Sequence, residues 1–493
     1  MIEKELKLLL NTEDVDKVKQ HPLLQQASKN SQLLYSVYFD TVEHDLLRNK
    51  IGFRIRHIDE RRIQTLKTAG SGVGGLHTRQ EWENDITGDT PDYEQIPTDA
   101  LPYLPANFNT IQPIFTTEFK RITWLININN SVIEIALDQG EVKNSNQSKP
   151  ISEIELELKS GSEINLYEAA LILLDDIPFT IENKSKAAIG YSLCKPQPLK
   201  SYKAGSIQFD STTTAEQAFI HIIWHCLQHL QANEDIVLYN NDIEGVHQMR
   251  LALRRLLSGL NLYKTLIPKK SYKKLRQELK WINDVLAVAR DWDVLAVNLQ
   301  PIQPYCSMEE LKSKLTTKQT EAYVKVRDML RSQRYTRTLL LLSKWLLEKS
   351  WRNNLEDKYL QHLDNPTTDF ANQVLTTRQA AIRCEDITKL NSTQLHDLRI
   401  DIKKINYGIR FFVDFYPANI IRPYNKTISH LKDELGFFND AYVANKLLEQ
   451  LDLEPKTKHF LTGWYSYQQM LYLDKFKTSW QNFVEKPILK FEA

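Results

Sequence analysis

The sequence predicts an α+β protein in two parts: an N-terminal antiparallel β-barrel with flanking helices, and a C-terminal all-α bundle of two tandem four-helix-like repeats. Three observations predict this class. Stretches before Pro196 alternate charged and apolar side chains with the period of two that β-strands require. From Thr214 onward, apolar residues recur at helical spacing. One motif of this second part recurs 149 residues later (396 − 247).

The length and composition indicate a globular chain with more than one domain. Its 493 residues exceed the roughly 250–300 residues at which single cores stop growing. The stretch from Pro196 to Ala215 is rich in Pro, Gly, Ser and Thr. We therefore predict a first domain at 1–200, a linker at 201–213 and a helical domain at 214–493.

Charge and hydropathy limit the expected cellular location of the protein and the classes of partner that it binds. The net charge of +1 gives the whole chain no bias toward polyanions, so nucleic acid is not expected as a partner and any basic surface must be local. No apolar run approaches the ~18 residues of a membrane span, and the acidic N-terminus lacks the order of a signal peptide. We therefore expect a cytoplasmic protein without a membrane partner.

Cysteine usage agrees with a reducing compartment. The four cysteines, Cys194, Cys226, Cys306 and Cys384, are far apart and match no zinc-binding spacing. We expect them to be buried free thiols.

The first predicted strand, Met1–Leu10, carries an unusual face. Alternation places Glu3, Glu5 and Lys7 on the same side of it. Three charges on one strand face are costly unless they border a polar cavity or meet a ligand. We infer that the two carboxylates hold a divalent cation and that the lysine faces a phosphate.

Later strands repeat this pattern of one charged and one apolar face. Within 52–58, Arg54 and Arg56 lie opposite Phe53 and Ile55. The other predicted strands are 33–40, 62–68 with Lys67, one holding Arg79, Glu81 and Glu83, 118–128 with Arg121, 132–140 with Glu134 and Asp138, and 151–159 with Glu153, Glu155 and Glu157. Helices are expected near 12–26 and 163–175, and a glycine-rich turn at 70–75.

A shared charged interior suits a metal bound to a polyanion. Barrels of about eight strands have room for one small ligand. Carboxylate oxygens suit Mg²⁺ or Mn²⁺, and arginine offers bidentate contacts to phosphate. In-line attack of water on a phosphoryl group is the predicted chemistry. Each strand alone could be a charged face in contact with solvent. The prediction therefore depends on the same alternation of charged and apolar residues recurring in all of these strands.

At these residues the sequence resembles the CYTH domain family, the triphosphate tunnel metalloenzymes. Glu3-Lys-Glu5-Leu-Lys7 looks like the ExExK signature of that family, and the resemblance covers about residues 1–195. It implies a tunnel that holds a triphosphate with Mg²⁺ or Mn²⁺. The implied metal ligands are Glu3, Glu5, Asp138, Glu155 and Glu157. The implied catalytic and substrate-binding residues are Lys7, Arg54, Arg56, Lys67, Arg79, Arg121, Glu134 and Lys186.

The resemblance leaves some roles and the substrate open. Lys184 competes with Lys186, and Glu81, Glu134 and Glu153 could be metal ligands, water-positioning bases or supporting groups. Hydrolysis of inorganic triphosphate is the expected activity, because the second half resembles the partner domain found with it. Thiamine triphosphatase or adenylate cyclase activity is the alternative.

The second half contains an internal duplication. His247-Gln-Met-Arg250-Leu-Ala-Leu-Arg254-Arg255 matches His396-Asp-Leu-Arg399-Ile-Asp-Ile-Lys403-Lys404 at the 149-residue offset. The register continues without gaps to Asp291 and Asp440, which predicts two copies of one helical unit. We expect these aspartates to orient the arginines or cap helices.

Each copy carries a basic stripe on one helix face. Two such stripes predict a positive groove, although a solvated basic face is the ordinary alternative. The residues of the predicted groove are His247, Arg250, Arg254, Arg255, His396, Arg399, Lys403, Lys404 and Arg410. His221, His225 and His229 also share a helix face, which we interpret as partly buried rather than as a metal site.

These residues resemble the CHAD domain, whose copies carry His-x-x-Arg-x-x-x-Arg-Arg on one helix. The resemblance spans roughly 210–485 and implies a module that binds long-chain polyphosphate. The second copy departs from the first in its lysines at 403 and 404 and in Asn439 where the first has Arg290. A non-catalytic polyphosphate-binding protein is thus a further alternative, and association with polyphosphate granules is left open.

Overall fold

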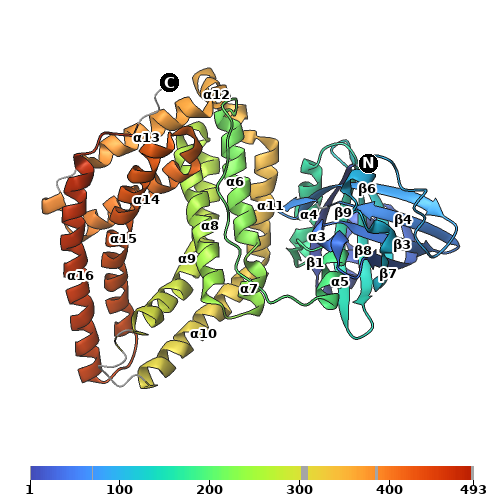
Figure 1. The fold of residues 1–493 in the computed structure, drawn as a ribbon, viewed down its shortest axis with the longest axis horizontal. Helices are drawn as coiled ribbons and strands as arrows, with labels where there is room; N and C mark the ends of the chain where they lie inside the picture. Colours follow the sequence, from blue (N-terminus) through green and yellow to red (C-terminus); the bar gives the residue numbers. More distant parts are fainter. Residues whose placement is uncertain (1, 69, 301, 303–308, 384–386, 490–493) are drawn as a thin grey trace. The chain divides into compact units, whose positions relative to one another are not determined.

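The computed structural model describes residues 2–68, 70–300, 302, 309–383 and 387–489 (Figure 1). Two compact units divide the chain. The barrel unit comprises Met1–Leu199 together with Arg331–Lys349, and the helical unit comprises Lys200–Leu330 and Ser350–Ala493. Every described helix is too short or too polar to serve as a membrane span.

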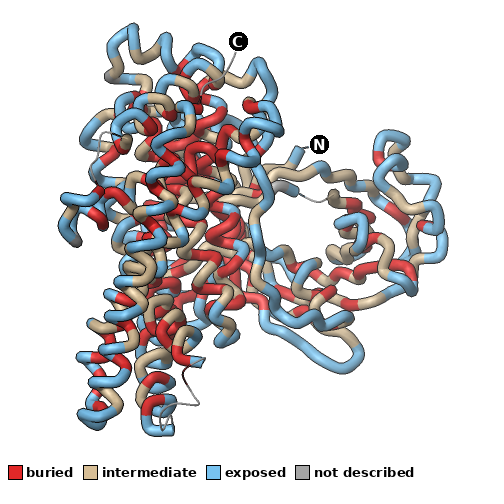
Figure 2. The backbone as a smooth tube through the Cα atoms, turned by 60° about the vertical axis from the view of Figure 1, so that its left-hand side comes forward, coloured by how far each residue is buried: buried red, intermediate tan, exposed pale blue. Residues whose placement is uncertain are grey.

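One antiparallel sheet of ten strands forms the barrel unit within the described residues. The strand order is β10-β1-β9-β8-β7-β2-β3-β4-β6-β5, and β1 also pairs with β6, so eight strands close into a barrel, as predicted. Figure 2 shows these strands as a ring with buried residues along its wall. Their bounds are β1 Ile2–Leu10, β2 Ser28–Asp40, β3 Gly52–Ile58, β4 Arg61–Lys67, β5 Ser71–Val73, β6 Leu76–Ile86, β7 Gln112–Ile128, β8 Ser131–Lys143, β9 Ser148–Ser160 and β10 Phe179–Ile181.

The strands extend further than the sequence pattern alone predicts. The expected turn at 70–75 was partly wrong, because it contains the short strand β5 and turns only at Gly74 and Gly75, where φ is 66° and 83°. The single helix expected near 12–26 was also wrong. It is broken at His21, whose ψ of 132° suits the residue before a proline. Its pieces are η1 Thr12–Asp14, α1 Val15–Gln20 and α2 Pro22–Gln25.

The apolar faces of the strands pack against helices on the outside of the barrel. Leu6 and Leu8 of β1 join a core that includes Leu166 of α4 (Ile164–Asp176) and Leu340 of α11 (Gln333–Glu348). Figure 1 shows α11 beside α4. The Thr336 hydroxyl of α11 donates to the Phe179 carbonyl oxygen over 3.1 Å. A helix that lies far along the chain therefore completes the core of the barrel unit.

Four further short elements belong to the barrel unit. They are α3 Asp45–Arg48, the 3₁₀ helices η2 Leu101–Tyr103 and η3 Phe108–Thr110, and α5 Lys186–Cys194. The Ser185 hydroxyl caps α5 by accepting from the Ala188 backbone N–H over 3.1 Å.

The helical unit confirms the duplication at the level of element boundaries. Helices α8 (Ile243–Leu262) and α14 (Ser392–Phe411) begin 149 residues apart (392 − 243) and end 149 residues apart (411 − 262). The helices that follow them, α9 and α15, also begin 149 residues apart (418 − 269). The unit's helices are α6 Ala215–Gln231, α7 Glu234–Tyr239, α8, α9 Lys269–Asn298, α10 Glu309–Arg331, α12 Asp357–Asp364, α13 Thr367–Arg383, α14, α15 Ala418–Glu449 and α16 Pro455–Val484.

The two cysteines within the described residues, Cys194 and Cys226, are free thiols. Cys194 is half-buried and Cys226 is buried. Burial raises the pKa of the Cys226 thiol to about 12, which makes it unreactive. The predictions for Cys306 and Cys384 concern positions outside the described residues.

The packing of α11 predicts a stability effect in the barrel unit. Leu340→Ala should destabilise this unit by about 2–5 kcal/mol, because the fully buried side chain would leave a cavity. Hydrogen exchange of β1 and β9 at increasing denaturant measures it. The control Leu125→Ala, at a side chain that is 45% exposed, should change the free energy of unfolding by less than about 1 kcal/mol. Equal effects of both variants would contradict the role of α11.

Candidate functional site

The barrel encloses a polar cavity of about 640 Å³. Its wall is built from the charged strand faces that the sequence predicts. The predicted residues that line it are Glu3, Glu5, Lys7, Arg54, Arg56, Lys67, Arg79, Arg121, Glu134, Glu155, Glu157 and Lys186. Asp138 is fully buried and bonded to two of them, Arg121 and Lys186, instead of lining the cavity itself.

Lys186 is the centre of a buried cluster of acids and bases. Its Nζ lies 2.6 Å from Asp138 Oδ2 and 2.9 Å from Glu155 Oε1, and it also contacts Glu153. Arg121 donates to Asp138 from Nε over 2.8 Å and from Nη2 over 2.6 Å. Lys7 contacts Glu155. We call these six residues the inner cluster: Lys7, Arg121, Asp138, Glu153, Glu155 and Lys186.

The inner cluster is balanced in charge. Its three carboxylates form a group with the spacing of metal ligands, the one such group among the described residues. Burial alone would raise the pKa of Glu155, but the charges of Lys186 and Lys7 lower it well below its ordinary value. Three acids thus face three bases, and the Lys186 ammonium already contacts all three carboxylates.

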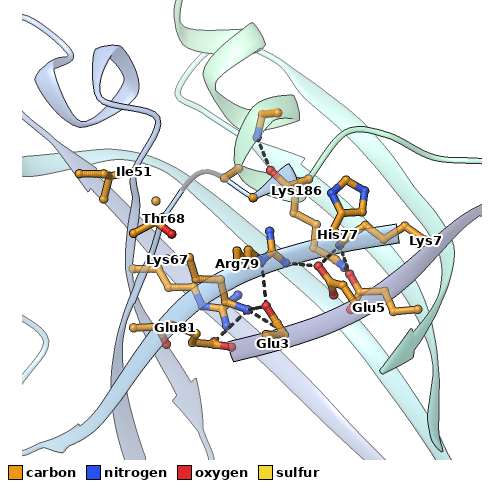
Figure 3. Close-up of a pocket in the computed structure, with 18 of the residues that line it drawn as sticks. Glu3, Glu5, Lys7, Ile51, Lys67, Thr68, His77, Arg79, Glu81 and Lys186 are labelled. Carbon is orange, nitrogen blue, oxygen red and sulfur yellow. Dashed lines mark hydrogen bonds and ion pairs between the residues drawn. The ribbon is translucent and has the colours of Figure 1, made fainter. Parts of the chain in front are cut away.

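A second group of carboxylates, Glu3 and Glu5, is held by Lys67 and Arg79. Lys67 Nζ lies 2.9 Å from Glu3 Oε1, and Arg79 Nε donates to Glu3 Oε2 over 2.7 Å (Figure 3). Arg79 also contacts Glu5. Burial opposes ionisation of Glu3, but Lys67 and Arg79 lower its pKa far below the ordinary value. Glu3 is therefore a carboxylate at neutral pH.

Glu157 joins Glu5 and Glu134 in one row across the sheet. Glu157 on β9 is the cross-strand neighbour of Glu5 on β1 and of Glu134 on β8. Burial raises the pKa of Glu157, and the nearby charges of Glu3 and Glu134 raise it further, while Lys159 opposes this. We call Glu5, Glu157 and Glu134 the carboxylate row.

Two arginines in the same cavity have weaker compensation. Arg54 Nη1 donates to the Tyr38 hydroxyl over 3.5 Å, its Nη2 lies 3.8 Å from Glu83 Oε1, and its buried Nε has no hydrogen-bond partner among the described residues. Arg56 donates to Ser36 Oγ over 3.3 Å and makes no ion pair among the described residues. Burial, followed by the charges of Arg54 and Arg121, lowers the pKa of Arg56 to about 9. A cation in a cavity whose hydrogen-bond partner is a neutral hydroxyl, as for both arginines here, is suited to an incoming anion.

The sequence analysis missed several residues of the cavity wall. Tyr38, His77 and Lys159 are among them, whereas Glu81 and Glu83, which the sequence groups with Arg79, also line the cavity. Strand parity could have found the missed residues, because Tyr38 is paired with Arg54, and Lys159 follows Glu157 by two residues. The sequence left open whether Lys184 or Lys186 belongs to the cavity. Lys186 is buried in the cavity wall, whereas Lys184 is exposed.

In the helical unit, bases from both copies influence one another. Arg250 on α8 donates to Asp291 over 2.9 Å, as expected for an aspartate that orients an arginine. Arg254 and Arg399 make no ion pair among the described residues. Burial, followed by the charges of Arg399 and Arg254, lowers the pKa of Lys403 to about 6. We call Arg250, Arg254, Arg399 and Lys403 the basic cluster.

Other predicted groove residues have different neighbours. Arg255 lies 3.3 Å from His225 and over the Phe411 ring, and Lys404 pairs with Asp401 over 2.7 Å. His247 is partly buried. Burial lowers its pKa, and the charges of Arg290, Arg254 and Arg250 lower it further. His396 is exposed 3.3 Å from Asn439, and Arg410 is exposed.

The three histidines of α6 do not form a metal site. His229 bonds Gln248, His225 contacts Arg255, and the ring of His221 packs on Phe209. Among the described residues, the group with metal-ligand spacing is Asp138, Glu153 and Glu155 rather than these histidines.

Comparisons with known proteins agree with this geometry. The CYTH domain family matches residues 1–191, and the CHAD domain family matches residues 221–449. The chain therefore consists of an N-terminal CYTH domain followed by a CHAD domain. Helix α11, which belongs to the barrel unit, lies inside the second match.

Two relatives cover different parts of the chain. An inorganic triphosphatase from Haemophilus influenzae is 38% identical over 170 residues, which are 34% of this chain and 48% of that protein. The chain thus spans about half the length of this relative. The crystal structure of the CHAD domain from the plant Ricinus communis is 27% identical, with a TM-score of 0.50, and covers 59% of this chain and 99% of that one.

The balance of the inner cluster predicts a pH-dependent defect. Lys186→Met should destabilise the barrel unit by about 3–5 kcal/mol at pH 7, because three buried carboxylates would lose their shared cation. Without that cation their pKa values rise, so the folded variant binds more protons than the unfolded chain. Its stability deficit should therefore shrink as the pH falls from 7 to 5. Denaturant unfolding at both pH values measures this.

A matched control separates this effect from loss of charge in general. Lys184→Met removes an exposed lysine two residues away and should leave the free energy of unfolding within about 0.5 kcal/mol. A Lys186→Met deficit that does not change with pH would contradict the ionic role of Lys186.

Proposed function

We propose that the barrel unit hydrolyses inorganic triphosphate to diphosphate and phosphate with the help of a divalent cation. The observation that carries this proposal is that one cavity holds both weakly paired arginines and a row of carboxylates. Arg56 is a half-buried cation whose hydrogen bond goes to a hydroxyl, and Arg54 is a buried cation whose nearest paired carboxylate, Glu83, lies 3.8 Å away. The carboxylate row lines the same cavity. A metal–triphosphate complex has the matching charges, with a cation for the row and phosphate oxygens for the arginines.

The phosphate chain would lie among the bases of the cavity. Arg54 and Arg56 offer planar guanidiniums for bidentate contacts to phosphate oxygens. The first turn of α5 also lines the cavity, and a helix N-terminus favours an anion. Arg121 and Lys186 keep positive charge close to this position while they bond to buried acids.

The residues present fit a divalent cation with oxygen ligands. Glu3, Glu5 and Glu157 are carboxylates that line the cavity, and Mg²⁺ and Mn²⁺ prefer such ligands together with water and phosphate oxygens. When bound, the cation would neutralise phosphate charge and lower the pKa of a bound water. Asp138 and Glu155 stay in the proposed ligand set, although both carboxylates already bond to Arg121 and Lys186.

The protein's own contribution to the reaction is positioning and electrostatics. A water oxygen forms a bond to a terminal phosphorus while the bridging P–O bond breaks and diphosphate leaves with that oxygen. One water proton is released, and we assign Glu134, which lines the cavity, to accept it. The bases around the phosphates stabilise the negative charge that moves onto the leaving diphosphate.

Inorganic triphosphate is favoured over organic triphosphates by the cavity wall. Charged side chains dominate it, and its aromatic residues are Tyr38, His77 and Tyr191. The 38% identical relative is an inorganic triphosphatase. Thiamine triphosphate hydrolysis and cyclic AMP formation from ATP are the competing activities.

Phosphate release from a panel of substrates tests this function. Purified full-length protein with Mg²⁺ or Mn²⁺ should release phosphate from triphosphate faster than from ATP, thiamine triphosphate or long-chain polyphosphate, and not after chelation. Glu5→Gln and Glu157→Gln should abolish turnover. Arg56→Ala should lower kcat/KM by about 100-fold or more, because it removes a buried phosphate contact.

The control for Arg56 is Arg61, an exposed arginine that pairs with the exposed Asp85 over 2.9 Å. Arg61→Ala should retain wild-type turnover. Cyclic AMP from ATP would favour a cyclase, and phosphate release from none of the substrates would leave a binding role alone.

We further propose that the helical unit binds long-chain polyphosphate through the basic cluster. Burial, together with the charge of Arg250, lowers the pKa values of Arg254, Arg399 and Lys403, and the charge of Arg399 also lowers those of Arg254 and Lys403. These three bases lack ion-pair partners among the described residues, so a polyanion would relieve their repulsion. Binding by charge should weaken steeply with salt.

Paired substitutions test this binding role. Arg254→Ala with Arg399→Ala should weaken polyphosphate binding by tenfold or more at physiological salt, because two unpaired cations are lost, and should leave triphosphate cleavage unchanged. Fluorescence anisotropy with labelled polyphosphate measures the affinity. The control Lys280→Ala removes an exposed lysine of α9 that pairs with Asp284, and it should bind like the wild type. Equal affinity of the double variant would refute the site.

A further inference from the structure

Lys159 lies beside the carboxylate row and has no role in the function described so far. It follows Glu157 by two residues on β9, so both side chains point into the cavity. Its Nζ lies 2.8 Å from Glu157 Oε2 and 3.4 Å from Glu134 Oε1. One ammonium thus neutralises two neighbouring carboxylates.

The carboxylate row needs a cation. Like charges directly opposite each other on adjacent strands destabilise a sheet, and Glu157 faces Glu5 on one side and Glu134 on the other. Arg79 contacts Glu5. Lys159 is the cation that holds the other two carboxylates together.

Lys159 also differs from the lysine of the inner cluster. The Lys186 side chain is 6% exposed and contacts three carboxylates, so its departure would leave buried charges uncompensated. The Lys159 side chain is 38% exposed, and its partners Glu157 and Glu134 are 29% and 28% exposed. Its ammonium can therefore move into water at little cost.

We propose that Lys159 is the displaceable counter-ion of the metal site. Its ammonium neutralises Glu157 and Glu134 in the metal-free protein and leaves them when a divalent cation binds to the carboxylate row. Lys159 then sets the metal affinity, because the ammonium and the metal compete for the same oxygens. This inference rests on the metal dependence of the proposed function.

Metal binding without substrate tests this role. Lys159→Met should bind Mn²⁺ roughly tenfold more tightly than the wild type, as measured by electron paramagnetic resonance of free Mn²⁺. In chelator the variant should melt at a lower temperature than the wild type, and Mn²⁺ should abolish the difference. The control Lys149→Met, at an exposed lysine of the same strand, should match the wild type in both measurements.

A second measurement uses the unmodified protein. The rate at which an acylating reagent modifies Lys159, followed by mass spectrometry, should rise several-fold when Mn²⁺ is added, because the amine is released from its ion pairs. The Lys149 rate should stay constant.

The outcomes separate this inference from the proposed function. Unchanged Mn²⁺ affinity in Lys159→Met, or an unchanged Lys159 acylation rate, would overturn the counter-ion role and leave metal-dependent hydrolysis intact. Failure of the wild type to bind Mn²⁺ would overturn both.

Discussion

The site depends on the double pairing of β1, which bonds to β9 on one side and to β6 on the other. This pairing closes the barrel and turns the charged strand faces toward one another. Glu5 lies between Glu157 and His77 only because of that register. A shift by one residue would turn every side chain of β1 to the opposite face and place Leu6 and Leu8 inside the cavity.

Closure also explains why so many charges can be tolerated in one interior. The inner cluster pairs three bases with three acids and is therefore a structural element as much as a chemical one. Compensation is weaker elsewhere in the cavity, since Arg56 has only a hydroxyl partner and Lys159 is shared between two acids. We interpret these imbalances as the binding determinants of the substrate and the metal.

Much of this arrangement could be predicted because strand parity is a local property. Arg54 and Arg56 alternate with Phe53 and Ile55, and burial of the apolar pair on the outer face leaves the arginines inside. The helical duplication was equally accessible, because the offset is preserved in the boundaries of α8 and α14.

Other features depend on tertiary contacts that no local pattern encodes. The helical periodicity of α11 predicts a helix but not that Leu340 joins the barrel core. Similarly, the motif groups Arg254 with Arg255, yet adjacent helix positions point about 100° apart. Arg255 therefore meets His225 and Phe411, whereas the pKa of Arg254 responds to Arg250 and Arg399.

The most direct test of the central claim is a crystal structure of the protein with triphosphate and Mn²⁺ under non-hydrolysing conditions, with anomalous scattering to locate the metal. The account predicts phosphate oxygens on the Arg54 and Arg56 guanidiniums and a manganese ion on carboxylates of Glu3, Glu5 and Glu157. Triphosphate bound outside the barrel, with no ordered ligand in its cavity, would contradict it.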